Sequence, residues 1–405
     1  MADIAVMGYG TVGSGVVKVL ETNKSLIGRR AGQEIFVKYV LDLRDFPGDP
    51  IEKKITHRFE DILEDASISV VVEVMGGLKP AYDFTRRALE AGKSVCTSNK
   101  ELVATHGQEL IEIAKKNNVN YLFEASCGGG IPIIRPLNSS LTAEDIDEIS
   151  GILNGTTNYI LTEMSEKGSD FETALKEAQE LGYAERNPEA DVEGYDACRK
   201  IAILSSLAFG RTVRYEDVYT EGITKITPLD IAYAKKMDMV IKLVASGFKT
   251  GEGGTKYNCL VSPFMIGFSH PLSRVNGVFN AVFVHGNTLG DSMFYGSGAG
   301  SLPTASAVVG DVVDCVRHLG KTITIIWDSE KLVLSDIKTV SRSFFLRVPS
   351  KDLDRAKELF PVKEVIRLDS SSDEVGIVTD VISEEAFERA ANSLGTVISR
   401  IRIAI

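Results

Sequence analysis

The sequence has little cysteine, no excess of positive charge and no long uninterrupted apolar run. Its five cysteines include no C-x-x-C pair, and the odd count argues against a disulfide framework. We therefore expect a reducing, cytoplasmic environment and no zinc site. No apolar run approaches the length that crosses a bilayer, and no basic segment typical of a secretion signal stands at the N-terminus. A membrane partner is not expected.

The excess of acidic over basic residues argues against a second class of partner, the nucleic acids. The chain carries 45 lysines and arginines against 56 acidic residues, for a net charge of −11. Nucleic acids require a basic face, so no nucleic-acid partner is expected. With 405 residues, 44% hydrophobic and 25% charged, the chain has the composition of a globular protein and the length of two or three domains.

The most specific feature that is present is a glycine pattern near the N-terminus. A strand-like segment, residues 3–7, runs directly into Gly8-x-Gly10-x-x-Gly13, and an amphipathic helical pattern follows. Strand, glycine turn and helix form the dinucleotide-binding fingerprint in its expected context, although an ordinary glycine-rich turn is the alternative. We predict NADP or NAD as the cofactor, bound at the helix N-terminus by Gly8, Tyr9, Gly10, Thr11, Val12 and Gly13.

The remaining pattern divides the chain into three parts. In residues 1–130, strand-like and helical segments alternate, which predicts an α/β fold with a doubly wound, Rossmann-type parallel sheet. Residues 131–304 mix helical segments with glycine-rich strands, which predicts an α+β domain for substrate binding and dimerisation. Helix 305–320 is expected to return to the first domain. The order βαββαβ in residues 335–405 predicts a ferredoxin-like domain.

The element boundaries are also predicted from the periodicity. Strands are expected at residues 3–7, 36–41, 69–74, 94–97, 119–123, 257–266, 277–285, 344–348, 364–368, 375–379 and 397–403. Helices are expected at residues 81–91, 102–116, 171–181, 191–209, 305–319, 353–360 and 384–394.

Three later segments carry residues suited to binding or chemistry. Lys100 follows the fourth strand-like segment, where ligands bind in such sheets, although a solvated surface lysine is the alternative. Glu124 and the glycines at 128–130 form an oxygen-rich loop that suits a hard cation or an interdomain hinge. Asp196 and Lys200 lie one helical turn apart beside an apolar stripe, which suits either acid–base chemistry or a surface ion pair.

Taken together, these motifs resemble those of one family, the homoserine dehydrogenases. The resemblance extends from the first strand to about residue 320 and includes residues 8–15, 73–77, 97–100, 124–132, 154–158, 182–200 and 298–305. It implies an oxidoreductase that interconverts L-homoserine and L-aspartate 4-semialdehyde with NAD(P), at the branch point of threonine and methionine biosynthesis.

The resemblance also implies roles for individual residues. Lys200 matches the catalytic proton donor, and Asp196 matches the carboxylate that binds substrate and orients this lysine. Glu185 matches the residue that holds the substrate amino group, and Asp191 lies in the same substrate-binding segment. Lys100 matches a lysine near the nicotinamide and the substrate.

Further sites are implied in the same way. Gly182 and Gly298 match cofactor contacts, and a monovalent cation (Na⁺) site is implied at Glu124, Cys127, Gly129 and Ile131, the last three through carbonyl oxygens.

The C-terminal part resembles a regulatory ACT domain, but residues 349–354 lack the glycine turn that commonly lines an effector site. The family assembles through its middle domain, so we expect a homodimer or a higher homo-oligomer. No kinase domain precedes the fingerprint, which suggests a monofunctional enzyme.

Two other functions remain open from the sequence. One is a non-catalytic sensor of amino acids or dinucleotides on the same fold, and the other is an NAD(P) oxidoreductase acting on a related amino acid.

Cofactor choice is balanced, because Asp42 favours NAD whereas Arg44, Lys53 and Lys54 favour NADP. Leu41 stands where many relatives have an arginine. We expect both cofactors to be used, with a modest preference for NADP.

Overall fold

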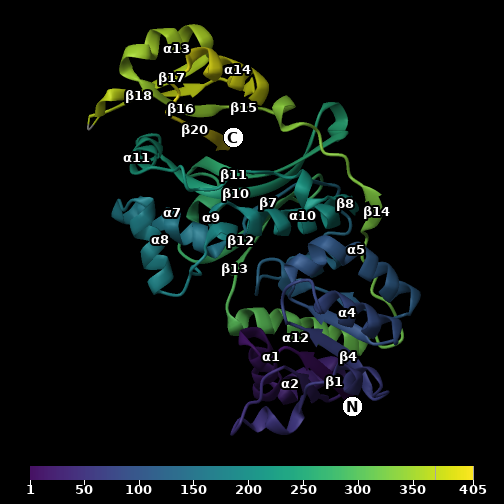
Figure 1. Ribbon diagram of the computed structural model, residues 1–405. Helices are drawn as coiled ribbons and strands as arrows, with labels where there is room; N and C mark the ends of the chain where they lie inside the picture. The colour runs from purple at the N-terminus through teal and green to yellow at the C-terminus, as the bar shows by residue number, and fades with distance from the viewer. Residues whose placement is uncertain (370, 405) are drawn as a thin grey trace. The chain divides into compact units, whose positions relative to one another are not determined.

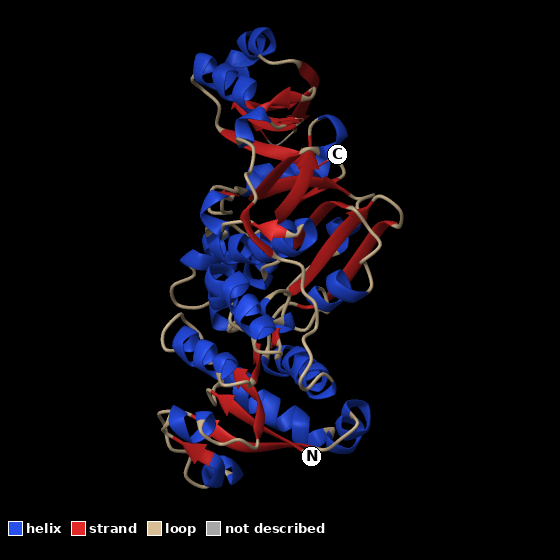
Figure 2. Cartoon of the chain, turned by 90° about the vertical axis from the view of Figure 1, so that its right-hand side faces the viewer, coloured by secondary structure: helices blue, strands red, loops and turns tan. Residues whose placement is uncertain are grey.

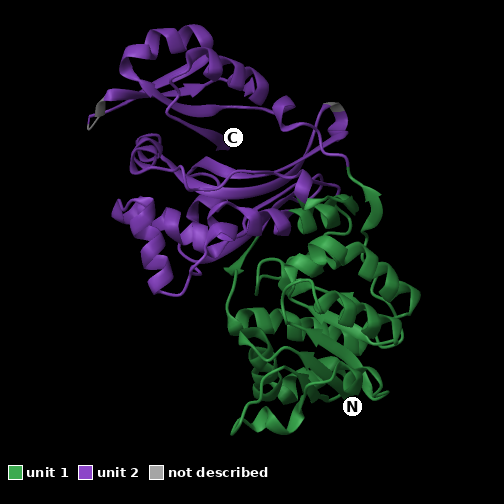
Figure 3. Ribbon diagram, in the orientation of Figure 1, with its two compact units in different colours: residues 1–144, 202–215, 294–332 green, residues 145–201, 216–293, 333–405 purple. Residues whose placement is uncertain are grey.

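The computed structural model describes residues 1–369 and 371–404. The chain divides into two compact units, coloured green and purple in Figure 3. Unit 1 comprises residues 1–144, 202–215 and 294–332, and unit 2 comprises residues 145–201, 216–293 and 333–405. Both units are discontinuous, so segments far apart in the sequence meet within each of them.

Unit 1 is built on a six-stranded parallel sheet in the order β3-β2-β1-β4-β5-β6. Its central strands are apolar and buried almost throughout, because helices cover both faces. The strand order reverses at β1, which confirms the predicted doubly wound sheet and places the ligand-binding switch point at its carboxyl end. The strands are β1 (Ala2–Met7), β2 (Ile35–Leu41), β3 (Ile55–Thr56), β4 (Ile68–Glu73), β5 (Ser94–Thr97) and β6 (Tyr121–Leu122).

A helix from a distant part of the chain completes this unit. Helix α12 (Ser301–Arg317) lies along α1 (Thr11–Thr22), as Figure 1 shows. Gly15 permits the contact, since a Cβ there would lie 2.8 Å from the Ser301 hydroxyl oxygen. The other helices are α2 (Lys24–Ala31), α3 (Phe59–Leu63), α4 (Ala81–Glu90), α5 (Lys100–Lys116) and α6 (Ile134–Ser139). Strands β8 (Arg211–Thr212) and β14 (Asp328–Lys331) form a small parallel pair.

Two details of unit 1 differ from the sequence prediction. The sequence prediction included no helix over residues 24–31, where the structure has α2. The strand predicted over residues 119–123 is limited to the two residues of β6, because the chain turns into a 3-10 helix at Glu124–Ser126.

Unit 2 contains the larger sheet, in the order β13-β12-β7-β10-β11-β20-β16-β18-β17, with β9 beside β11. Its longest strands are red in Figure 2. The strands are β7 (Ile146–Ile152), β9 (Tyr219–Thr220), β10 (Met239–Thr250), β11 (Lys256–Gly267), β12 (Phe279–Gly286), β13 (Gly290–Ser297), β16 (Phe344–Pro349), β17 (Val362–Leu368), β18 (Ser371–Thr379) and β20 (Ser399–Ala404). Of β13, residues 290–293 belong to unit 2 and residues 294–297 to unit 1. Strands β15 (Ser341–Arg342) and β19 (Ile382–Ser383) form a separate antiparallel pair.

Helices pack against the central strands of this sheet, where α7 contacts β10 and β12. The predicted helix over residues 191–209 is interrupted, because Gly194 adopts a left-handed φ of +83° between α9 and α10. The helices are α7 (Gly155–Lys167), α8 (Phe171–Glu180), α9 (Glu189–Val192), α10 (Tyr195–Phe209), α11 (Pro228–Lys236), α13 (Leu353–Leu359) and α14 (Glu384–Leu394). Of α10, residues 195–201 belong to unit 2 and residues 202–209 to unit 1.

The C-terminal residues form the predicted ferredoxin-like arrangement. The elements β16, α13, β17, β18, α14 and β20 follow one another along the chain, and their strands pair antiparallel in the order β20-β16-β18-β17. Strand β20 also pairs in parallel with β11, with Phe264 opposite Arg402. The C-terminal sheet therefore continues the sheet of the middle segment.

The sequence prediction missed four strands of the large sheet: β7, β9, β10 and β13. Both β7 and β10 carry charged residues within an otherwise apolar segment, which hides the strand pattern. In β10 the ammonium of Lys242 is buried and donates to the side-chain oxygens of Asn158 and Asn276 and to the Val275 carbonyl, at 2.6–3.0 Å. Burial lowers the pKa of Lys242 to about 8. Hydrogen bonds to residues distant in the sequence offset the cost of burying this lysine inside the sheet.

Two further features of the chain concern its helices and its cysteines. No helix in residues 1–369 or 371–404 is both long and apolar enough to cross a membrane. All five cysteines are buried, and none forms a disulfide.

Candidate functional site

The glycine turn of unit 1 has the geometry that a dinucleotide requires. Gly8 has a φ of +100°, which favours glycine, and a Cβ at Gly13 would lie 1.9 Å from the Gly8 carbonyl oxygen. These two glycines therefore close the turn against the helix. Gly10 differs, because a Cβ there would meet no atom within 4 Å. The space above Gly10 is open to a ligand.

The beginning of α1 is suited to an anion. Gly10 is its N-cap, no side chain caps the helix, and no acidic residue lies in its first turn. The amides of Thr11 and Val12 belong to this turn, and the helix dipole adds partial positive charge there. These features fit the pyrophosphate of a dinucleotide.

A cavity of about 510 Å³ adjoins the glycine turn. Gly8 and Gly10 line it, together with Leu41, Asp42, Arg44, His57 and the aromatic rings of Phe59 and Phe84. It lies at the carboxyl ends of β1 and β2, where this fold binds the adenosine part of a dinucleotide.

Asp42 and Arg44 form a clasp beside this cavity. The Asp42 carboxylate accepts hydrogen bonds from the Tyr9 amide at 2.8 Å, from the Arg44 amide at 3.0 Å, and twice from the Arg44 guanidinium at 3.0 Å. The Arg44 guanidinium and these amides hold the pKa of Asp42 well below its usual range. The arginine also lies over the Phe46 ring. A ribose hydroxyl would thus meet a carboxylate that is already fully hydrogen-bonded.

His57 adds a titratable group to the same cavity. Its Nδ1 lies 2.7 Å from the Asp42 carbonyl oxygen, and its Nε2 lies 3.1 Å from an Asp45 carboxylate oxygen. Both partners are acceptors, so both contacts are satisfied only when the imidazole carries two protons. The hydrogen bond to the Asp42 carbonyl raises the pKa of His57. The sequence analysis did not single out this histidine.

Lys100 is the first residue of α5, behind a loop held by buried polar contacts. Asn99 caps the helix by accepting from the Leu102 amide at 3.1 Å, and it donates to the Gly77 carbonyl at 2.6 Å. The Thr97 hydroxyl donates to buried Glu73 at 2.6 Å, and burial raises the pKa of that carboxyl. These contacts fix the place of Lys100, which is partly exposed.

The loop that begins at Glu124 differs from the expectation of a carboxylate aimed at a cation. One Glu124 carboxylate oxygen accepts from the amides of Ile133 and Ile134 at 2.5 and 2.9 Å, and the other accepts from the Arg135 amide at 2.7 Å. The carboxylate therefore caps α6. Burial raises the pKa of Glu124, although the hydrogen bonds from these amides act to lower it. Three main-chain amides thus hold this carboxylate in place.

The glycines of this loop bring its backbone against the 297–300 turn. Gly128 and Gly129 have left-handed φ values of +71° and +57°. A Cβ at Gly129 would lie 2.5 Å from the carbonyl carbon of Gly298, and the Gly130 amide donates to the Ser297 carbonyl at 3.1 Å. Cys127 and Ile131 are buried on either side. Among the described residues, no group of three or more His, Cys, Asp or Glu side chains could hold a metal ion.

Unit 2 carries a buried polar cluster at the start of α10. The Lys200 ammonium donates to the Asp196 carboxylate at 2.7 Å and to the Leu153 carbonyl at 2.8 Å. Both residues are less than a tenth exposed. The contact expected from their spacing of four residues is present, and it is buried rather than on the surface.

Asn154 joins a second carboxylate to this cluster. Its side-chain amide donates to Asp191 at 2.7 Å and to Asp196 at 2.9 Å, while its oxygen accepts from the Thr157 amide at the start of α7. Burial raises the pKa of Asp191, and the nearby charge of Asp196 adds to the shift. The sequence analysis quoted the motif at residues 154–158 but gave Asn154 no role. Its N-cap position before Gly-Thr-Thr was the available signal.

Glu185 and Gly182 lie in an exposed loop before α9. The Glu185 carbonyl, rather than its carboxylate, accepts from the Gln179 side chain at 3.0 Å, and the carboxylate is exposed. Gly182 has a φ of +75°, which lets the chain leave α8. The loop is tied to α7, where the Thr156 hydroxyl donates to the Tyr183 carbonyl at 2.6 Å. The structure thus joins Asp196 and Lys200 directly and Asp191 through Asn154, and it leaves Glu185 on a neighbouring loop.

A Rossmann-type unit with an open glycine turn, together with a buried lysine–carboxylate cluster, defines a dinucleotide-dependent oxidoreductase. Family models bear this out: the NAD binding domain of homoserine dehydrogenase matches residues 8–124, and the homoserine dehydrogenase model matches residues 132–313. The chain belongs to the homoserine dehydrogenase family.

Individual relatives agree with this assignment. A homoserine dehydrogenase of Neisseria gonorrhoeae is 39% identical over all of this chain and 94% of its own length. The crystal structure of a homoserine dehydrogenase from Thiobacillus denitrificans matches with a TM-score of 0.90 and 35% identity, covering 100% of this chain and 98% of that one. A hyperthermophilic archaeal homoserine dehydrogenase in complex with NADPH matches with a TM-score of 0.66 and 28% identity, covering 78% of this chain and 97% of that one.

Proposed function

We propose that the enzyme interconverts L-homoserine and L-aspartate 4-semialdehyde with NADP or NAD, in threonine and methionine biosynthesis. The observation that carries the proposal is the buried set of Lys200, Asp196, Asn154 and Asp191, in a chain whose other unit has the dinucleotide turn. Incubating the protein with L-homoserine and NADP should produce NADPH, measured by its absorbance. The absence of turnover with either cofactor would refute the proposal.

The roles we assign follow from charge and position. The substrate is a zwitterionic amino acid, and the carboxylates of Glu185, Asp191 and Asp196 suit its ammonium group. During reduction, negative charge develops on the substrate carbonyl oxygen, where the Lys200 ammonium stabilises it and donates a proton from Nζ. In the oxidative direction a neutral Nζ takes that proton back. Asp196 and the Leu153 carbonyl hold the lysine in place, so they orient it without reacting.

The dinucleotide is assigned to Gly8, Tyr9, Gly10, Thr11, Val12 and Gly13, with further contacts from Lys100, Gly182 and Gly298. The open space at Gly10 and the uncapped, acid-free start of α1 support this assignment. When bound, the nicotinamide supplies or accepts the hydride. We assign Lys100, held at the start of α5, to the reacting end of the site.

We also propose a monovalent cation, Na⁺, at the loop of residues 124–131. Main-chain carbonyl oxygens of Glu124, Cys127, Gly129 and Ile131 would be its ligands, which are donors that a hard cation accepts. The carboxylate of Glu124 already caps α6 and would support the loop from behind.

The remaining assignments concern organisation. We propose three functional segments: residues 1–130 with helix 305–320 for the dinucleotide, 131–304 for substrate and dimerisation, and 335–405 as an ACT-like regulatory part. The ferredoxin-like topology supports the last of these.

We also propose a homodimer or higher oligomer, which exposed Met293 and Tyr295 on the edge strand β13 support. Buried thiols without disulfides support a cytoplasmic location.

Cofactor preference should be modest. The carboxylate of Asp42 is already occupied by the clasp, which weakens its contact with the ribose hydroxyl of NAD, while Arg44 offers a charge to the 2′-phosphate of NADP. We expect kcat/KM to favour NADP by less than about a thousandfold, which corresponds to roughly 4 kcal/mol. Steady-state rates with each cofactor measure the ratio, and a larger preference would show that one of these groups dominates.

The preference for NADP should depend on pH through His57. This side chain gains charge as pH falls through its pKa, which lies above the ordinary value of about 6.5. Below that pKa the imidazolium adds attraction for a 2′-phosphate, and the attraction is lost as pH rises through it. We expect the dissociation constant of NADP, but not that of NAD, to increase over this range. In His57→Gln this increase should disappear, and an unchanged profile would exclude His57.

Replacement of Glu185 should affect substrate more than cofactor. Its carboxylate is exposed on the loop before α9, so Glu185→Ala removes a charge without disturbing a buried contact. We expect KM for homoserine to rise about tenfold, while the dissociation constant of NADP stays within about twofold, since a charge-assisted contact contributes roughly 1.5–3 kcal/mol when fully formed. The neighbouring variant Glu189→Ala is the control. A loss confined to NADP binding would show that the substrate assignment is wrong.

A further inference from the structure

One short segment of unit 2, residues 219–224, lies between the C-terminal sheet and the proposed substrate residues. Strand β9 runs parallel to β11, with Tyr219 opposite Leu260. The Glu221 amide then donates to the Val261 carbonyl, and the Ile223 amide donates to the Val192 carbonyl, both at 2.8 Å. The segment therefore bridges β11 and the end of α9 by main-chain hydrogen bonds.

The contact with α9 is close enough to transmit displacement. A Cβ placed at Gly222 would lie 2.3 Å from the Val192 carbonyl oxygen and 2.5 Å from the Glu193 Cα. Backbone thus packs directly on backbone at this point. The turn at residues 192–194 connects Asp191 to α10, which carries Asp196 and Lys200. A shift of Gly222 would move this turn.

Gly194 makes the second contact of the turn with this segment. It has a φ of +83°, and a Cβ there would lie 3.2 Å from the Thr220 methyl carbon. The Thr224 hydroxyl also donates to the Glu193 carboxylate at 3.1 Å. The turn is therefore held by residues on both sides of Glu221.

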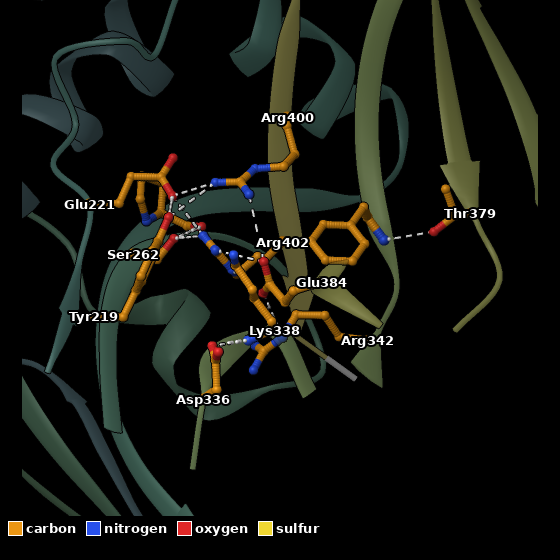
Figure 4. A network of polar contacts seen from close by, with 12 residues as sticks. Tyr219, Glu221, Ser262, Asp336, Lys338, Arg342, Thr379, Glu384, Arg400 and Arg402 are labelled. Carbon is orange, nitrogen blue, oxygen red and sulfur yellow. Dashed lines mark hydrogen bonds and ion pairs between the residues drawn. The ribbon is translucent and has the colours of Figure 1, made fainter. Parts of the chain in front are cut away.

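On its other side, the segment is held by arginines of the C-terminal sheet. Figure 4 shows Arg400 and Arg402, two residues apart on β20, reaching the same carboxylate oxygen of Glu221, each at 2.7 Å. The Tyr219 hydroxyl donates to that oxygen at 3.1 Å. Burial opposes ionisation of Glu221, but the two arginine charges prevail and lower its pKa.

Arg402 is itself fixed. It is 1% exposed, and it donates to both carboxylate oxygens of Glu384 at the start of α14, at 2.6 and 2.9 Å, and to the Ser262 hydroxyl at 2.6 Å. A buried, bidentate pair of this kind is costly to break on one side only. The C-terminal sheet thus presents a rigid pair of charges to Glu221.

We propose that Glu221 is a positioning residue, through which the C-terminal ferredoxin-like sheet sets the place of Asp191 and Asp196 in the substrate site. The path is contiguous: Arg400 and Arg402 hold the Glu221 side chain, and the backbone on either side of it holds the turn at residues 192–194. The inference rests on the proposed substrate role of Asp191. It assigns to the C-terminal sheet an influence on substrate affinity that acts even without an effector.

The test compares Glu221→Gln with a control that damages the same sheet elsewhere. Glutamine keeps the size of the side chain but removes its charge. Arg347→Met is the control, because Arg347 on β16 forms a buried ion pair with Asp230 of α11, at 2.9 Å, and does not contribute to the Glu221 cluster. Both variants remove one partner of an ion pair made by an arginine of the C-terminal sheet, so both should lower thermal stability.

We expect Glu221→Gln to raise KM for homoserine about tenfold, with an unchanged dissociation constant for NADP, and Glu221→Asp to recover part of the loss. Arg347→Met should leave KM within about twofold. An unchanged KM in Glu221→Gln, or an equal rise in both variants, would overturn the proposal.

A further variant separates this result from a failure of the site assignment. Asp191→Asn should raise KM for homoserine by itself, and the effect of Glu221→Gln should be smaller in its presence than in the wild type. If Asp191→Asn leaves KM unchanged, the substrate role of Asp191 is wrong. If Asp191→Asn raises KM and Glu221→Gln does not, only the positioning role is wrong.

Discussion

Replacement of Lys200 by alanine is expected to lower kcat by roughly a hundredfold to ten-thousandfold, the usual contribution of a positioned acid or base. The dissociation constant of NADP should change little, because Lys200 donates to Asp196 and to the Leu153 carbonyl within unit 2, whereas the glycine turn belongs to unit 1. The comparison requires steady-state rates with homoserine and a fluorescence titration with NADPH.

Two controls make this result specific. Lys176 is an exposed lysine on α8, so Lys176→Ala should keep wild-type turnover. Lys200→Ala also leaves Asp196 without its ammonium partner, so its thermal midpoint should be measured to ensure that the variant is folded at the assay temperature. Turnover near that of the wild type would remove Lys200 from the mechanism.

Two features of the candidate residues could be predicted from the sequence because they are local. The dinucleotide turn is local, since one strand, one turn and one helix within the first 22 residues define it. The pairing of Asp196 with Lys200 is also local, because a spacing of four residues on a helix brings side chains together. Such features follow from the periodicity of a single element.

Other parts of the site depend on contacts between distant segments. Asn154 lies 42 residues before Asp196, and no periodicity links them. The Glu124 carboxylate was expected to face a cation, but its oxygens meet amides nine to eleven residues further on. The contact between Asp42 and Arg44 could be anticipated from their neighbouring positions. His57, in contrast, lies beside the same cavity because β3, which directly precedes it, pairs with β2.

The same reasoning explains which parts of the fold were found. The ferredoxin-like order was predicted because its elements are short, carry a regular pattern of apolar residues and are separated by clear turns. Its attachment to the middle segment, where β20 pairs with β11, was not predicted, because strand partners far apart in the chain are selected by tertiary packing. The interruption at Gly194 was missed because a glycine inside a helical pattern is tolerated as often as it ends a helix.

Replacement of Gly10 by alanine is expected to weaken NADP binding by about a hundredfold, or roughly 2.7 kcal/mol, while leaving the fold intact. The backbone at Gly10 has a φ of −85°, which any residue adopts, and a new Cβ would meet no protein atom within 4 Å. The methyl group would instead occupy the space through which the pyrophosphate approaches. The dissociation constant of NADPH and the thermal midpoint of the empty protein are the two measurements.

Variants at three positions separate binding from folding in this experiment. Gly10 is the N-cap of α1, so alanine there should cost about 1 kcal/mol of stability, and Gly10→Ser should restore the cap while still obstructing the cofactor. A Cβ at Gly28, inside α2, would lie 3.7 Å from its nearest neighbours, which is an ordinary contact distance. Gly28→Ala should therefore lower neither the affinity for NADPH nor the thermal midpoint. Gly13→Ala should disrupt the turn itself, because its Cβ would lie 1.9 Å from the Gly8 carbonyl oxygen. If Gly10→Ala and Gly10→Ser bind NADPH as the wild type does, the pyrophosphate does not cross Gly10, and the cofactor must lie elsewhere on the sheet.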